Sequence, residues 1–193
     1  MSMYDMFVHP RGTAGHAAAR LMARTGTGLA NDAIKLLDLD PHANVLEIGF
    51  GPGVALQRLL EAVPDGHVAG VDPSAVMHQH ARERNTAAVK EGRLELHRST
   101  AADLPVSVGT MDAVLAIDNL HFWPSIPAGL SEIRRVLRPG GIFVCAFSPP
   151  SGGPPPHLAA LLASQGYETT TAGIKTRQGR LFQVRVPRAS TAA

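Results

Sequence analysis

The sequence predicts an α/β fold in which helices cover both faces of a mostly parallel sheet, ending in an antiparallel hairpin. From Asn44 onward, short β-rich runs alternate with helical segments, and this alternation is typical of parallel strands joined by right-handed crossovers. The run 114–117 is continuously apolar, as expected for a strand that is covered on both faces. Together these features predict a three-layer sandwich around a seven-stranded sheet.

The predicted elements follow in order along the chain. The strands are 44–49, 67–71, 93–98, 112–117 and 142–147, and the hairpin strands are 167–171 and 180–186. The helices after the first strand are 53–63, 74–85, 128–137 and 157–165. Basic residues close the helix 128–137 and Pro-Gly-Gly follows it, which is a helix stop signal. Gly173 and Gly179 separate the two hairpin strands.

Three regions differ in composition. We expect residues 1–43 to form a helical lid segment, 44–187 the main domain and 188–193 a frayed tail. The helical stretch 13–37 is interrupted at 25–28 by Thr-Gly-Thr-Gly, so it forms two helices or one broken helix. Residues 148–156 (SPPSGGPPP) exclude helix and central strand, because proline lacks an amide donor and glycine is permissive.

Composition narrows the functional classes. The 193 residues are 45% hydrophobic and 18% charged, with a net charge of +2, which is ordinary globular composition. Basic residues are not clustered, so nucleic acid is not expected as a partner. We find neither a signal peptide nor an apolar run of about 18 residues, so we expect no membrane contact and a cytoplasmic location. The single cysteine, Cys145, excludes an internal disulfide.

The clearest motif is the glycine-rich turn EIGFGPG at 47–53, which follows an apolar strand and opens a helix. Each missing Cβ lets a ligand lie against bare backbone. Open α/β sheets bind ligands at the carboxyl ends of their strands, where this turn lies. The alternative is a tight turn without a ligand.

The spacing of this turn favours a cationic, phosphate-free ligand. A dinucleotide fingerprint would place its third glycine at Val54, whereas here it is Gly53. Glu47 would repel a pyrophosphate and attract a sulfonium or an ammonium group. A Walker loop is excluded because no Gly-Lys-Ser/Thr follows. A nicotinamide-dependent oxidoreductase is therefore disfavoured.

A second motif, VAGVDPS, ends the second predicted strand with Asp72. An acid about 20 residues after the glycine turn is placed to accept hydrogen bonds from both hydroxyls of a ribose. Alternatively, Asp72 caps the helix that begins near Ser74. The glycine turn upstream favours ribose binding.

Five motifs together resemble the class I S-adenosylmethionine-dependent methyltransferases, in the small-molecule, type 11-like branch. They are VLEIGFGPG (45–53), GVDPS (70–74), STAADLP (99–105), MDAVLAIDNLHFW (111–123) and EIRRVLRPGG (132–141). The resemblance covers about 44–147, and the C-terminal hairpin extends it. It implies a seven-stranded Rossmann-like sheet, S-adenosyl-L-methionine as cofactor and S-adenosyl-L-homocysteine as product.

The resemblance also implies cofactor contacts. They are Glu47, Gly49, Phe50, Gly51 and Gly53 for the methionine and ribose part, Asp72, Pro73 and Ser74 for the ribose and adenine edge, Thr100 and Ala101 for the adenine ring, and Asp118 and Asn119 near the ammonium. Many relatives have an aspartate for the adenine amine where this chain has Thr100, which would bond the amine more weakly. Asp103 is the second candidate for this role.

The segment 118–123 (DNLHFW) would lie beside the transferable methyl group. His121 is the candidate general base, because an imidazole accepts a proton near neutrality; the alternative is a histidine that only packs. Phe122 and Trp123 either line the pocket, with cation–π contact to the sulfonium, or belong to the core. The remaining candidate substrate contacts are Tyr4, His9, Arg11 and Ser148.

These readings predict in-line methyl transfer from S-adenosylmethionine to a small organic acceptor. The alternative is a protein that binds S-adenosylmethionine without transferring methyl groups, as a partner subunit or a repurposed scaffold. A metal is not expected, since the loop FSPPSGG after the fifth strand offers no acid or amide. With so short a lid, the pocket is open, completed by a second subunit in a homodimer, or shaped for a small apolar metabolite.

Overall fold

The computed structural model describes residues 12–188 and contains one seven-stranded sheet in the order β3-β2-β1-β4-β5-β7-β6. The strands are β1 (Asn44–Ile48), β2 (His67–Val71), β3 (Leu94–His97), β4 (Met111–Ile117), β5 (Leu137–Phe147), β6 (Glu168–Lys175) and β7 (Arg180–Arg185). Strands β1 to β5 pair in parallel, whereas β7 is antiparallel to both β5 and β6. The predicted fold class is confirmed.

The order of the parallel strands reverses between β1 and β4, which are neighbours in the sheet. Their following loops leave the carboxyl edge in different directions, and ligands of open α/β sheets bind in the crevice formed there. The glycine-rich turn after β1 and the segment 118–123 after β4 flank this point. The fold therefore places two motifs from distant parts of the sequence at one edge.

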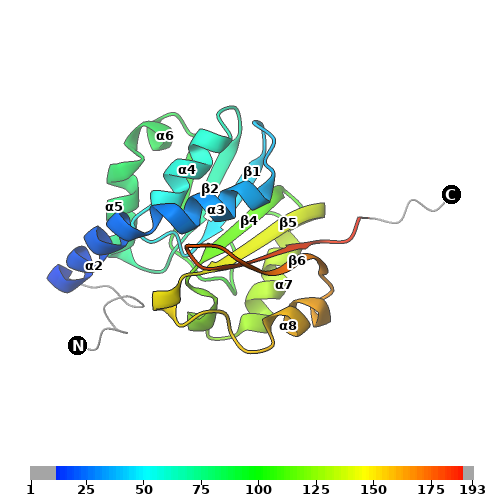
Figure 1. Ribbon diagram of the computed structural model, residues 1–193. Coiled ribbons are helices and arrows are strands. Elements are labelled where there is room, and N and C mark those ends of the chain that lie inside the picture. Colours follow the sequence, from blue (N-terminus) through cyan, green and yellow to red (C-terminus); the bar gives the residue numbers. More distant parts are fainter. Residues whose placement is uncertain (1–11, 189–193) are drawn as a thin grey trace.

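Helices form a layer on each face of the sheet (Figure 1). They are α2 (Gly12–Thr25), α3 (Thr27–Leu37), α4 (Val54–Ala62), α5 (Ala75–Arg84), α6 (Thr86–Lys90), α7 (Ile126–Val136) and α8 (Leu158–Ser164). Helices α3 to α6 pack over one buried cluster around Leu56 and Leu59. Helices α7 and α8 cover a second cluster around Leu130 and Phe143. No helix within 12–188 is long and apolar enough to cross a membrane.

Several boundaries differ from the predicted ones. The N-terminal interruption is Gly26 alone, between α2 and α3. Helix α7 begins before Pro127, because Ser125 caps it by accepting a hydrogen bond from Ala128 N at 3.3 Å, and proline is tolerated in a first helical turn. The segment 148–156 contains one short 3-10 turn, η2 (Pro149–Ser151), so the exclusion of all helix there was wrong.

Two strands extend further than predicted. Strand β5 starts at Leu137, which pairs with Met111 directly after α7 ends. Strand β6 continues through Gly173, which has φ +67° and lies at a shift in register between Thr171 and Ile174. A glycine inside a strand accommodates such a bulge and need not end the strand.

Candidate functional site

The glycine-rich turn after β1 requires glycine at its two ends. Gly49 has φ +70° and Gly53 has φ +79°, a backbone region that costs other residues free energy. A Cβ on Gly49 would overlap the Asn119 amide, and one on Gly53 would lie 2.8 Å from Ala81 Cα. Gly49 N also donates to Val71 O at 2.7 Å, across to β2. Glycine at these two positions therefore lets Asn119 and α5 pack directly on the turn at the carboxyl edge of the sheet.

Asp72 connects this turn to the end of β2. Its side chain is 7% exposed, and its two carboxylate oxygens accept hydrogen bonds from Gly51 N at 3.0 Å and Ser74 N at 2.8 Å. Burial raises the pKa of Asp72 despite these bonds. The residue that caps α5 is Ser74, whose hydroxyl accepts from Met77 N at 3.4 Å. Asp72 lies before this cap and orients the turn.

Glu47 lies beneath the turn and not on its surface. It is 3% exposed, and its carboxyl accepts a hydrogen bond from the backbone of Leu56, in the first turn of α4. Burial, followed by the nearby charge of Asp72, raises the pKa of Glu47 well above its usual range. Its Oε2 has no hydrogen-bond partner among residues 12–188. A cation bound nearby would relieve this unfavourable burial.

Asp118 links the end of β4 to the end of β5 by hydrogen bonds. Its backbone has φ +54°, and its carboxylate accepts hydrogen bonds from Ser148 N at 2.6 Å and Ser148 Oγ at 2.7 Å. The structure thus brings two candidate site residues, 30 positions apart, into contact. Both carboxylate oxygens of Asp118 therefore accept hydrogen bonds from Ser148.

Asn119 bridges the two strands at the reversal point. Its Nδ2 donates to Ile48 O at 2.5 Å, and its side chain lies over Gly49. Its Oδ1 is buried and has no partner within the described part of the chain. The turn therefore faces a fixed acceptor that a bound donor would satisfy.

His121 lies in the 3-10 turn η1 (Leu120–Phe122) among aromatic rings. Its ring centroid is 4.0 Å from that of Phe122 and 6.2 Å from that of Phe147. Both imidazole nitrogens are buried without a hydrogen-bond partner in 12–188. Burial lowers the pKa of His121, although Asp118 opposes this shift. The imidazole is therefore kept neutral, as a proton acceptor requires.

Trp123 packs against α7. A Cβ built on Gly129 would lie 2.5 Å from the indole Cε3 of Trp123 and 3.2 Å from Ala101 Cβ. Glycine at this position allows the ring, the helix and the loop after β3 to meet closely. The structure therefore assigns Trp123 mainly to packing between these segments.

The turn after β3 carries the remaining cofactor candidates. Thr100 and Asp103 form an isolated bridge, and both are exposed, whereas Ala101 is 5% exposed. Arg98 Nε donates to Pro73 O at 3.2 Å, which holds the start of this segment next to the end of β2. Thr100 and Asp103 thus share one turn, and their geometry leaves both open as contacts to an adenine amine.

Two residues that the sequence analysis missed hold the glycine-rich turn from α5. Asn85 is 5% exposed, and its Nδ2 donates to Gly53 O at 3.1 Å and to Ala81 O at 3.0 Å. Arg84 Nε donates to Pro52 O at 3.0 Å. An asparagine at a helix end is typical of a C-cap. The sequence around Arg84 and Asn85 therefore gave no sign of contacts with the turn.

Other candidates have different placements. The side chain of Phe50 packs in the core, with its ring centroid 4.9 Å from that of His78. Only the backbone of Phe50 is therefore left to contact a cofactor. Tyr4, His9 and Arg11 lie outside the described residues. Among 12–188, no three histidine, cysteine or acidic side chains gather to hold a metal. Two open surface depressions adjoin Pro139, at the opposite edge of the sheet, and neither is lined by a candidate site residue.

Comparisons with known proteins agree on one family. A family described as a methyltransferase domain matches residues 45–141, just over half of the chain. An uncharacterized methyltransferase of Bacillus subtilis, YdaC, is 31% identical over 124 residues, 64% of this chain and 66% of that relative. A demethylmenaquinone methyltransferase of Symbiobacterium thermophilum is 38% identical over 106 residues, 54% of this chain and 42% of that relative.

A solved structure shares the fold over most of the chain. The crystal structure of a SAM-dependent methyltransferase from Aquifex aeolicus superposes with a TM-score of 0.72 at 20% identity, covering 88% of this chain and 96% of that one. By contrast, the sequence matches to these two curated relatives span at most 66% of their length.

Proposed function

Because the chain belongs to the methyltransferase domain family, we propose that it binds S-adenosylmethionine and transfers the methyl group to a small organic acceptor. The observation that carries this proposal is the turn at the carboxyl end of β1. Gly49 packs against Asn119 and Gly53 against Ala81 with no room for a Cβ, and the central amide of the turn, Gly51 N, donates to the carboxylate of Asp72 at 3.0 Å. A tight glycine turn at the carboxyl end of a parallel strand, with an acid at the end of the next strand, is the arrangement in which open α/β sheets bind a nucleoside through its ribose.

The unsatisfied polar atoms support a cationic cofactor. The buried acceptors without partners among the described residues include Glu47 Oε2 and Asn119 Oδ1. Asn119 lies against Gly49 of the turn, and Glu47 accepts a hydrogen bond from the backbone of Leu56 in the first turn of α4. An ammonium group would give Asn119 a donor and would offset the burial of Glu47. A pyrophosphate would supply neither a donor nor a positive charge.

The chemistry that the cofactor supplies when bound is an electrophilic methyl group on a positively charged sulfur. The acceptor's nucleophilic atom forms a bond to the methyl carbon as the carbon–sulfur bond breaks, with S-adenosylhomocysteine as the second product. The protein's contribution is alignment and exclusion of water. Asn119 and the glycine-rich turn orient the methionine end, and the aromatic ring of Phe122 excludes water beside it.

His121 is the proposed base for acceptors that lose a proton. Its lowered pKa keeps the imidazole neutral near pH 7, and both ring nitrogens are buried without partners in the part of the chain described. To accept the acceptor's proton as the new bond forms, one of these covered nitrogens has to come within hydrogen-bond reach of the bound acceptor.

The acceptor class and the partners belong to the same proposal. We take the acceptor as a small organic molecule, with no nucleic acid partner and a cytoplasmic setting. The net charge of +2 supports the exclusion of nucleic acid, because phosphate backbones are bound by dense clusters of basic residues. The relative named for demethylmenaquinone supports a small-molecule acceptor.

Two measurements test the proposal. Calorimetry with S-adenosylmethionine, S-adenosylhomocysteine and NAD should show binding of the first two and no binding of NAD; binding of NAD alone would overturn it. Incubation of the protein with labelled S-adenosylmethionine and a cell extract should then transfer label to a small molecule. Cofactor binding without transfer to any extract would instead support the non-catalytic alternative.

A further inference from the structure

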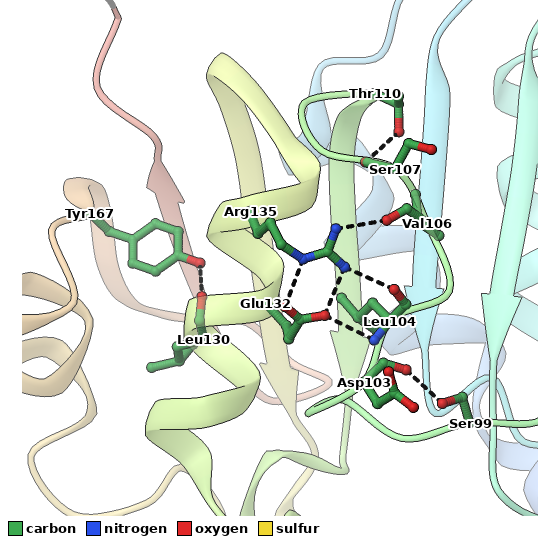
Figure 2. Close-up of polar contacts among 10 residues, drawn as sticks. All are labelled: Ser99, Asp103, Leu104, Val106, Ser107, Thr110, Leu130, Glu132, Arg135 and Tyr167. Atoms are coloured by element: carbon green, nitrogen blue, oxygen red, sulfur yellow. Dashed lines mark hydrogen bonds and ion pairs between the residues drawn. The ribbon is translucent and has the colours of Figure 1, made fainter.

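The connection between β3 and β4, residues 98–110, has no helix or regular strand of its own. Most connections within compact domains are shorter than this one, and long ordered connections often have a function. The segment starts at the carboxyl edge with the turn that carries Thr100 and Ala101, then runs along α7 to the amino edge, where β4 begins. Figure 2 shows Ser99 near the start of this segment and Thr110 at its end, with the side chains of Glu132 and Arg135 from α7 meeting its middle.

Arg135 of α7 holds the middle of this segment. Its Nη2 donates to Leu104 O at 2.8 Å and its Nη1 donates to Val106 O at 2.8 Å (Figure 2). The other side of the guanidinium donates to Glu132, at 2.6 Å from Nε and 2.7 Å from Nη2. One planar side chain thus makes four short hydrogen bonds, a pattern for which arginine is suited and lysine is not.

Glu132 completes the attachment from the same helix face. Its Oε2 accepts a hydrogen bond from Leu104 N at 3.0 Å, so both backbone polar groups of Leu104 are bound by this pair. Hydrogen bonding to Arg135 lowers the pKa of Glu132 and keeps the carboxylate charged. The side chain of Leu104 is 3% exposed, within the cluster beneath α7. Leu104 is therefore fixed by its backbone and by its side chain.

The turn 99–103, directly before Leu104, is held in place together with it. Ser99 Oγ donates to Asp103 O at 2.5 Å, and Asp103 N donates to Thr100 O at 3.2 Å. At its other end, Arg98 is bound to Pro73 O. The turn is thus closed by its own hydrogen bonds and is anchored at both ends, one of them directly next to Leu104.

We infer that Glu132 and Arg135 are positioning residues for the adenine end of the cofactor. They act through Leu104 on the turn that carries Thr100 and Ala101, and they do not touch the cofactor. The inference rests on the proposed function, because that function makes this turn the adenine contact. A role in stability alone would lower the melting temperature of a variant but would leave its preference among bases unchanged.

The chain offers a matched control beside Arg135. Arg134 also donates to a backbone carbonyl, Gln165 O at 2.9 Å, but this contact leads to the end of α8 and not to the 98–110 segment. Arg135→Gln removes the guanidinium that bonds Leu104, Val106 and Glu132, whereas Arg134→Gln removes a hydrogen bond to the end of α8. Glu132→Gln keeps the shape of the side chain and loses the charge, so it serves if Arg135→Gln does not fold.

The test compares S-adenosylhomocysteine with S-inosylhomocysteine, which lacks the exocyclic amine, by calorimetry. We expect the wild type and Arg134→Gln to prefer S-adenosylhomocysteine equally. Arg135→Gln should bind it about tenfold less tightly, as expected when one or two hydrogen bonds are weakened, and should lose most of the preference. A folded Arg135→Gln or Glu132→Gln variant with wild-type affinity and preference would overturn the inference.

Hydrogen exchange distinguishes this outcome from a failure of the proposed function. If the wild type binds neither compound, the proposed function is wrong. Independently of any ligand, backbone amides of residues 99–106 should exchange faster in Arg135→Gln than in Arg134→Gln. Equal exchange rates would show that the pair does not position the turn.

Discussion

Replacing Gly49 by alanine tests the closest contact of the site. The backbone there has φ +70°, and a Cβ would lie 2.9 Å from Asn119 Cγ and nearer still to its amide nitrogen. Asn119 would have to move, breaking its 2.5 Å hydrogen bond to Ile48 O. Gly49→Ala therefore combines backbone strain with the loss of the link between β1 and β4.

The expected cost follows from these two effects. A non-glycine residue in the left-handed region costs about 1–2 kcal/mol, and a lost hydrogen bond about 1 kcal/mol. The sum, about 2–3 kcal/mol, corresponds to a fall in melting temperature of roughly 4–12 °C for a chain of this size. Because Asn119 faces the proposed ammonium position, the affinity for S-adenosylhomocysteine should fall as well.

Gly92 provides the matched control. It has φ +72°, and no atom lies within 4 Å of a Cβ built on it, so Gly92→Ala should show the strain alone and leave ligand affinity unchanged. Thermal unfolding followed by circular dichroism, together with calorimetric titration, measures both effects. If the two variants lose equal stability and both bind S-adenosylhomocysteine like the wild type, the reasoning about Asn119 is refuted.

Three further outcomes are expected. Asp72→Ala should weaken cofactor binding by about 1.5–3 kcal/mol through lost charge-assisted bonds, and an unchanged calorimetric affinity would limit Asp72 to a structural role. His121→Ala should lower turnover with little change in cofactor affinity, so full activity would remove His121 from the mechanism. Glu47→Gln should reduce the pH dependence of the protein's stability. Burial raises the pKa of Glu47 in the folded protein above its usual value of 4.5. The free energy of unfolding therefore has its full value below pH 4.5 and falls as pH rises through the raised pKa. Ligand-free melting temperatures from pH 4 to 8 should therefore fall less steeply in this variant, and parallel curves would contradict the assignment.

The sequence could predict the elements whose signals are local. The alternation of strands and helices, the glycine turn and the acid after β2 each follow from neighbouring residues, because periodicity and backbone freedom are local properties. A signal that depends on the neighbouring strand led to a wrong boundary. Gly173 predicted the end of a strand, yet β6 continues past it, because pairing with β7 accommodates a bulge.

The sequence by itself therefore determined the sheet, the glycine-rich turn and the family to which the chain belongs. Only the tertiary structure decided how the site is held. Arg84 and Asn85 donate hydrogen bonds to the glycine-rich turn, 32 positions earlier. Glu132 and Arg135 bind the 98–110 segment, about 30 positions earlier. It also decided that Glu47 lies buried beneath the turn. The physical reason is that such contacts depend on how two layers pack, which no local pattern along the chain encodes.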